Sequence, residues 1–295
     1  MMGRRRFGSV RRLPSGRWQA RYRTSDGRLH TAPQTFATKT DATRFLVQAE
    51  ADLTRGRWSD PRLGRTPFAE WAARWQATTV NLRPNTRAAY TNLLRRYLLP
   101  TFDRMPLADL DPLAVRAWLA GMEAAGAGAS TRAKCYRLLS RILGQAVEAG
   151  YLSRNPCMVR GAASEPTTEM RFATVDQVAE LAEAMPPRFK ALVLVAAYTG
   201  LRWGELAGLR VKRVDLLHRR ITVAEQLTET RGAFAFGPPK TAAGMRTVTL
   251  PMVAATALAD HLTTYAEPGP DGLVFPAGRR GPLRRSNFTR RVWMP

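Results

Sequence analysis

Two cations in the C-terminal half of the chain stand in segments that suit phosphate chemistry. Arg202 lies in the segment Gly200-Leu-Arg-Trp-Gly-Glu205, at a predicted helix start where backbone amides add positive potential. A guanidinium matches two phosphate oxygens better than an ammonium does, and it can stabilise the charge of a pentavalent transition state. Glu205, three residues later, is placed to hold the Arg202 side chain. The segment predicts an arginine that binds a reacting phosphodiester.

Lys240 is the second candidate, in the Gly/Pro-rich turn Gly237-Pro-Pro-Lys240-Thr between two extended runs. A cation in such a turn can reach the leaving 5′ oxygen of a phosphodiester and protonate it as a general acid. Each residue also has an ordinary interpretation, because the chain holds 41 arginines and turns commonly carry lysine. Glu205 fits a helix-surface acid equally well. Spacing alone leaves both interpretations open.

The segment from Ala197 to Leu209 resembles the first catalytic box of the tyrosine recombinase (phage integrase) family. Lys240 followed by Arg246-Thr-Val-Thr-Leu-Pro resembles the hairpin that carries the family's catalytic lysine. The resemblance implies that Arg202 and Lys240 are catalytic, with Lys240 as general acid and Glu205 as a supporting residue. It extends over nearly the whole chain, because the predicted architecture is also that of the family.

The family's second box, of the form His-x-x-Arg, and its nucleophilic tyrosine are not found after Lys240. Tyr265 is the only tyrosine there, and it precedes the place of the missing box. His261 has no arginine at its third position. The final segment, residues 287–295, resembles the helix that precedes the second box in relatives. We therefore expect a chain cut short before its nucleophile and inactive in cleavage.

The charge predicts a polyanionic partner. The chain has 46 Lys+Arg against 23 Asp+Glu, a net charge of +23 and a pI near 11.4. Basic residues exceed acidic ones by 15 to 5 in residues 1–65, 13 to 7 in 66–165 and 18 to 11 in 166–295. Such a surplus favours nucleic acid, and its spread predicts contacts along a duplex.

The predicted fold class is multidomain. A small β-rich N-terminal arm is expected over residues 1–62, with short strands from Gly8, Trp18 and beyond Gly27, and a helix that opens at the segment Thr38-Lys-Thr-Asp41, where a Thr or Asp side chain can act as the cap. An all-α core-binding domain of SAM-like type is expected over residues 66–160. A mixed α+β, mainly α, catalytic domain is expected over residues 168–295, after a linker at 161–168 rich in small and polar residues.

The helical domain contains the clearest candidate for a DNA-binding face. Helices are predicted over residues 68–77, 85–98, 112–125 and 130–149, the last capped by Ser130. Along the last helix the polar side carries Arg132, Lys134, Arg137 and Arg141, while the apolar side faces the core. We expect these four residues to contact DNA, together with Arg17 and Arg21 of the arm. The alternative is a solvated charged face.

The sequence implies no metal, cofactor or membrane segment. His30, His218 and His261 are too scattered for a metal site, and we expect them at the surface or at strand ends. The two cysteines are too few for a disulfide framework and fit a reducing cytoplasm. The longest apolar run, from Ala191 to Tyr198, is far shorter than the roughly 20 residues of a membrane helix.

The predicted function is site-specific DNA recombination of phage or mobile-element type, through a 3′-phosphotyrosyl intermediate at attachment sites in double-stranded DNA. The resemblance implies self-association on DNA as a tetramer. The alternative is a non-catalytic DNA-binding protein derived from a truncated integrase. A type IB topoisomerase is less favoured because of the separate arm, and a helix-turn-helix repressor leaves the segments around Arg202 and Lys240 unexplained.

Overall fold

A computed structural model of the chain describes residues 7–24, 27–56, 58, 60–165, 167, 169–278 and 281–294. Contacts divide the chain into two compact units, Met1–Thr168 and Glu169–Pro295. The boundaries at 1–62, 66–160 and 168–295 remain predictions. The predicted linker over 161–168 includes Pro166 and Thr168, which lie outside the described residues.

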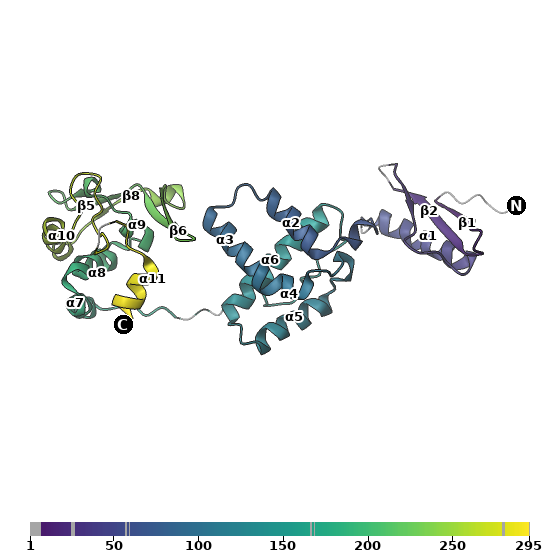
Figure 1. Cartoon of the computed structure of the whole chain (residues 1–295), viewed down its shortest axis with the longest axis horizontal. Helices are drawn as coiled ribbons and strands as arrows, with labels where there is room; N and C mark the ends of the chain where they lie inside the picture. Colours follow the sequence, from purple (N-terminus) through teal and green to yellow (C-terminus); the bar gives the residue numbers. More distant parts are fainter. Residues whose placement is uncertain are drawn as a thin grey trace. The chain divides into compact units, whose positions relative to one another are not determined.

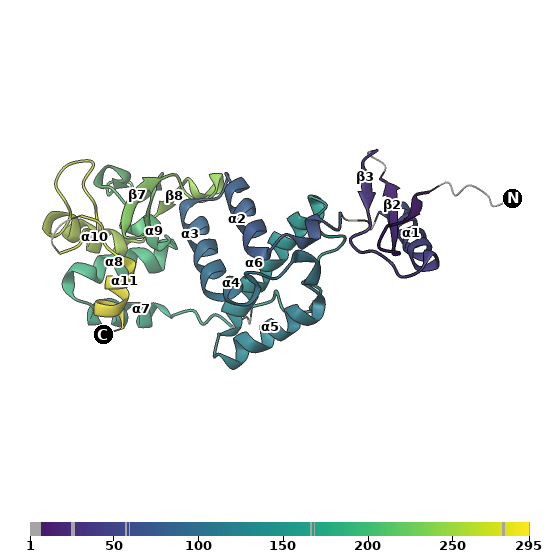
Figure 2. The ribbon, with the colours of Figure 1, turned by 45° about the vertical axis from the view of Figure 1, so that its right-hand side comes forward.

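The N-terminal arm is a small antiparallel sheet covered on one face by a helix (Figures 1 and 2). Its elements are β1 (Ser9–Arg12), β2 (Trp18–Arg23), β3 (Leu29–Thr31) and α1 (Lys39–Thr54), with the strands paired in chain order. Ala20 and Tyr22 alternate along β2 and are buried with Leu46 of α1. The helix opens in the predicted segment, and its cap is Thr38, whose hydroxyl accepts the Asp41 N–H at 3.1 Å.

The central part of the first unit is a bundle of helices around its own core (Figure 2). The helices are α2 (Phe68–Thr78), α3 (Pro84–Leu93), α4 (Leu99–Phe102), α5 (Pro112–Ala124) and α6 (Ala129–Glu148). A π-helical turn, Leu94–Leu98, joins α3 to α4. Along α6, Cys135, Leu139 and Ile142 are buried, and the Trp71 indole donates to the Ile142 carbonyl at 3.0 Å. The apolar side of the predicted helix is therefore its core side.

The start of α6 differs from the prediction. The helix begins at Ala129 with Gly128 at the N-cap position, so the cap predicted at Ser130 is wrong. Ser130 lies inside the first turn, where its hydroxyl donates to the Glu165 carboxylate. The Ser130 hydroxyl is therefore bonded to a residue 35 positions away instead of capping the helix backbone.

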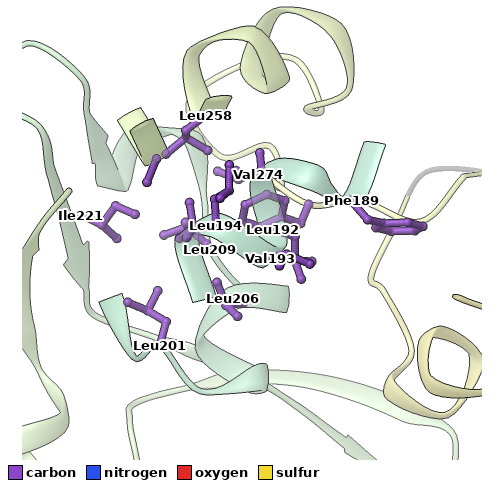
Figure 3. Close-up of a cluster of buried hydrophobic side chains, with 14 of the residues drawn as sticks. Phe189, Leu192, Val193, Leu194, Leu201, Leu206, Leu209, Ile221, Leu258 and Val274 are labelled. Carbon is purple, nitrogen blue, oxygen red and sulfur yellow. The ribbon is translucent and has the colours of Figure 1, made fainter. Parts of the chain in front are cut away.

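The second unit is a mixed domain built around α8. Its elements are α7 (Val175–Ala184), α8 (Pro187–Thr199), α9 (Trp203–Ala207), β4 (Val214–Asp215), β5 (Arg220–Val223), β6 (Gln226–Thr230), β7 (Ala233–Gly237), β8 (Arg246–Thr249), α10 (Met252–Thr264) and α11 (Arg285–Phe288). Leu192, Val193 and Leu194 of α8 lie in a cluster with Ile221 and Leu258 (Figure 3). One antiparallel sheet has the order β4-β5-β8, and β6 and β7 form another.

Two of the three histidines are buried. His30 and His261 are each 4% exposed, so the expectation that all three histidines lie at the surface or at strand ends is wrong for these two. Both pack among aromatic rings, Tyr22 and Trp58 around His30 and Phe275 beside His261.

No helix in the described part of the chain is long and apolar enough to cross a membrane.

Candidate functional site

Arg202 is exposed on a turn whose neighbours are anchored in the core. Helix α8 ends at Gly200, which has φ +62°, a left-handed conformation that favours glycine. Leu201 and Leu206, on either side of Arg202, are buried in the cluster around α8 (Figure 3). The Arg202 side chain is 73% exposed at the N-cap position of α9. The turn therefore fixes the backbone of Arg202 while leaving its guanidinium accessible.

Glu205 joins this turn to a strand far along the chain. Its side chain is 2% exposed and accepts the Arg202 N–H at 3.0 Å and the Arg202 guanidinium at 3.3 Å. Arg246 at the start of β8 donates to both carboxylate oxygens, at 2.9 Å and 3.3 Å. The contact expected between Glu205 and the Arg202 side chain is present. Arg246 adds a bidentate contact to Glu205 that the sequence did not predict.

The charged form of Glu205 is favoured despite its burial. Burial raises the pKa of its carboxyl, but the hydrogen bonds from Arg246 and from the Arg202 backbone and side chain outweigh that effect and lower the pKa below its usual range. A buried carboxylate held by two arginines neutralises part of their charge and restricts where they can move. The surface interpretation of Glu205 is therefore wrong.

Lys240 is exposed on the connection between β7 and β8. This connection is not the tip of a hairpin, because β7 pairs with β6 while β8 pairs with β5. Downstream of Lys240, the guanidinium of Arg246 also donates to the Gly244 carbonyl at 3.1 Å. The same arginine thus contacts the Lys240 connection and, through Glu205, the Arg202 turn.

Two glycines of the Arg202 segment allow α9 to lie against β6. A Cβ atom at Gly204 would stand 2.7 Å from the Leu227 carbonyl oxygen, and one at Gly208 would stand 2.6 Å from the Leu227 nitrogen. Both distances are shorter than a Cβ atom tolerates. The glycines of this segment therefore set the separation between the Arg202 turn and the β6–β7 pair.

Three of the four cations predicted to contact DNA on α6 lie on one stripe. Lys134, Arg137 and Arg141 follow Ser130 at helical intervals and border an open groove of about 590 Å³ between α3 and α6. Arg141 donates to the Tyr90 hydroxyl of α3 at 2.9 Å. Arg137 and Lys134 both pair with Glu165, and the Lys134 ammonium lies 3.6 Å from the Glu165 carboxylate.

Arg132 lies off this stripe and has partners of a different kind. It donates to the Ala127 carbonyl at 2.8 Å and pairs with Glu123 of α5 at 2.9 Å. Its side chain is 26% exposed, less than that of Lys134 or Arg137. These contacts hold the start of α6 to the end of α5.

The uncovered face of the arm sheet carries Arg21. Residues Arg11, Arg21 and Arg23 occupy the strand positions opposite to the buried Ala20 and Tyr22, so they share the face that α1 does not cover. Arg17 is exposed in the turn before β2, where its guanidinium donates at 2.6 Å to both the hydroxyl and the carbonyl of Thr35.

Sequence reasoning missed Arg246, Arg11 and Arg23. Period-two alternation in residues 18–23 contained the signal for Arg23, and the strand pairing of Arg11 with Gln19 places it on the same face. Arg246 had no local signal, because its partner Glu205 is 41 residues away. The described residues contain no group of His, Cys, Asp and Glu side chains arranged to hold a metal ion.

Comparison with known proteins decides the family. Family models match residues 6–55 as the phage integrase N-terminal domain, 68–162 as the phage integrase central domain and 171–293 as the phage integrase family. A putative prophage phiRv2 integrase of Mycobacterium tuberculosis is 36% identical over 281 residues, which cover 93% of this chain and 74% of the relative. The chain belongs to the phage integrase family of tyrosine recombinases.

Other integrases and solved structures agree with this assignment. The integrase of Mycobacterium phage D29 is 28% identical over 303 residues, covering 97% of this chain and 79% of that protein. The Tn1549 transposon integrase, solved with a circular intermediate DNA, has a TM-score of 0.67 at 19% identity and covers 75% of each chain. A lambda integrase dimer bound to a COC′ core site has a TM-score of 0.56 at 18% identity, covering 98% of this chain and 80% of that one. The integrase fold, with its arm, helical and catalytic parts, is thereby confirmed.

Proposed function

We propose that this integrase binds double-stranded DNA at attachment sites and that Arg202 and Lys240 act on the phosphodiester that is exchanged. The observation that carries the proposal is the buried Glu205 carboxylate, which fixes an exposed Arg202 at the surface of the second unit. Arg202 binds the non-bridging oxygens and stabilises the transition-state charge, and Lys240 protonates the leaving 5′ oxygen. Glu205 positions Arg202 from below.

Two surfaces of the first unit fit DNA. The uncovered face of the arm sheet presents Arg11, Arg21 and Arg23, and a short sheet of this kind fits the major groove. The α6 stripe of Lys134, Arg137 and Arg141 suits backbone phosphates. Arg17 and Arg132 are weaker candidates, because Arg17 lies in the turn before β2 and Arg132 lies off the α6 stripe with its side chain 26% exposed. The lambda integrase tetramer on a Holliday junction supports assembly of several copies on DNA, at a TM-score of 0.54.

A non-catalytic DNA-binding role is the second candidate, and the packing of Tyr265 is the observation that favours it. Tyr265 is the tyrosine that follows Lys240, and its ring packs against the buried His261 with the centroids 5.3 Å apart. A ring packed in this way suits a structural role better than a nucleophilic one.

Covalent trapping on a nicked attachment-site duplex tests the catalytic assignment. The polypeptide of residues 1–295 should bind this DNA without forming a covalent adduct, and a longer polypeptide that includes the second box and its tyrosine should form one. In the longer polypeptide, Arg202→Ala should lower the cleavage rate about 10²–10³-fold, as loss of a positioned charge donor does elsewhere. Lys240→Ala should be rescued by a substrate whose 5′ leaving group needs no proton.

Three results would overturn parts of this assignment. An adduct formed by residues 1–295 and mapped to Tyr265 would make that residue a nucleophile. An unchanged cleavage rate for Arg202→Ala in the longer polypeptide would remove Arg202 from the site. Equal loss of rate by Lys240→Ala on both substrates would remove its role as the acid.

A further inference from the structure

Glu165 stands at the centre of a set of donors on α6. The Ser130 hydroxyl and the Arg137 guanidinium donate to opposite oxygens of its carboxylate, and the Lys134 ammonium lies 3.6 Å from one of them. Arg137 also donates to the Ala163 carbonyl at 2.6 Å, so residues 163–165 lie along the start of the α6 stripe. A hydroxyl, an ammonium and a guanidinium around one anion are the groups with which proteins bind the phosphates of nucleic acids.

We propose that the Glu165 carboxylate occupies the place of a DNA phosphate on α6, so that residues 163–165 close this part of the surface until duplex DNA displaces them. The inference rests on the proposed function, since it takes the α6 stripe as a DNA-binding surface. It adds Ser130 as a phosphate ligand and gives the chain an internal competitor for its own partner.

The remainder of the stripe supports a continuous track for a DNA backbone. Beyond Lys134 and Arg137, the groove between α3 and α6 continues to Arg141, and Ala163 forms part of its lining. Arg141 is held by the neutral Tyr90 hydroxyl rather than by a carboxylate. Within the stripe, therefore, the acidic competitor covers the end that begins at Ser130.

The contact has the strength expected of a closure that DNA can open. Lys134, Arg137 and Glu165 are 54%, 45% and 34% exposed, and ion pairs this accessible to water contribute little stability. The hydrogen bonds from Ser130 and Arg137 hold the pKa of the Glu165 carboxyl at about 2, so it stays charged at neutral pH. Protonation does not open the contact under those conditions. A polyanion that offers many phosphates and releases counterions can displace one carboxylate.

Affinity for a labelled mixed-sequence DNA duplex, measured by fluorescence anisotropy with the full 295-residue chain, tests the proposal. Glu165→Gln should tighten binding about three- to tenfold and steepen the salt dependence, because two cations lose their competitor. Glu70→Gln is the matched control: it makes the same charge change and releases Arg74, which pairs with Glu70 at 2.5 Å on α2. The control should change affinity by less than about twofold.

Variants of the stripe test the α6 DNA-binding surface and its closure by Glu165 separately. Arg137→Ala should weaken binding, and in that background Glu165→Gln should lose most of its gain because the two residues act on one site. If Arg137→Ala weakens binding while Glu165→Gln matches or weakens the unchanged chain, the DNA surface stands and the closure is wrong. If Lys134→Ala and Arg137→Ala both leave affinity unchanged in chains of intact far-UV circular dichroism, the α6 surface itself is wrong.

Discussion

Arg246 supports the geometry around Arg202 through the Glu205 carboxylate. It donates to both oxygens of the Glu205 carboxylate, which is 2% exposed. Among the described residues, Arg202 is the other side chain that forms an ion pair with Glu205. Removing one partner of a buried charge leaves the other partly unpaired, which costs more than the pair itself contributes. The effect of Arg246 on Arg202 therefore passes through Glu205.

Arg246→Ala should destabilise the second unit by about 2–4 kcal/mol, since it leaves the buried Glu205 carboxylate with fewer charged donors. Arg246→Lys keeps one charged donor and should lose less. The measurement is urea unfolding followed by amide hydrogen exchange in α8, which reports on this unit alone. Equal exchange rates in all three chains would mean that Glu205 is satisfied without Arg246.

His261 should make the stability of the second unit depend on pH. Burial lowers its pKa from the ordinary 6.5, and the Val274 carbonyl at 2.7 Å from Nε2 opposes this only in part. The folded chain therefore binds this proton less readily than the unfolded chain, and stability falls as pH drops from about 7 to 5. His261→Gln keeps a side-chain N–H donor without the titration. Its unfolding free energy should change less over this range, and a slope equal to that of the unchanged chain would contradict the assignment.

At the scale of elements, the separation between α9 and β6 sets the position of the Arg202 turn. Gly204→Ala places a Cβ atom 2.7 Å from the Leu227 carbonyl oxygen, a backbone atom that cannot rotate away. The helix or the strand must move, at a cost of about 1–3 kcal/mol. Gly237→Ala is the control, because its Cβ atom would meet nothing within 4 Å. Thermal unfolding should separate the two variants, and equal midpoints would show that α9 and β6 adjust freely.

Local patterns predicted most elements, and contacts between distant residues account for the differences. Helical periodicity located α2, α5 and α6 to within about two residues, which is the usual uncertainty of helix ends. Strand β6 has little signal in the local sequence, because Gln226-Leu-Thr-Glu-Thr230 carries one apolar residue, and it forms through its pairing with β7. The hairpin expected around Lys240 is not formed by β7 and β8, because β7 pairs with β6 and β8 pairs with β5.

The candidate site divides in the same way. Arg202 and its contact with Glu205 followed from a spacing of three residues on one helix start. Arg246 reaches Glu205 across 41 residues, and Glu165 reaches Arg137 across 28, so neither contact has a signal in the local sequence. Tertiary packing, rather than propensity, brings these charges together.

At the scale of the whole molecule, the positive charge is distributed over every part of the chain. Residues 1–65 carry a net charge of +10, 66–165 carry +6 and 166–295 carry +7. Each part also presents cations on a defined surface: Arg21 on the arm sheet, Arg137 on α6 and Arg202 on the turn before α9. A duplex that meets several of these surfaces must release many counterions.

The salt dependence of duplex DNA binding by the 295-residue chain tests this account most directly. Phosphate contacts from the arm sheet, the α6 stripe and Arg202 predict that log affinity falls linearly with log salt, with a slope of about −5 or steeper. The double variant Arg137→Ala with Arg141→Ala should make that slope shallower by about 2. A slope for the unchanged chain shallower than about −2 would contradict the proposal that DNA is bound through these surfaces.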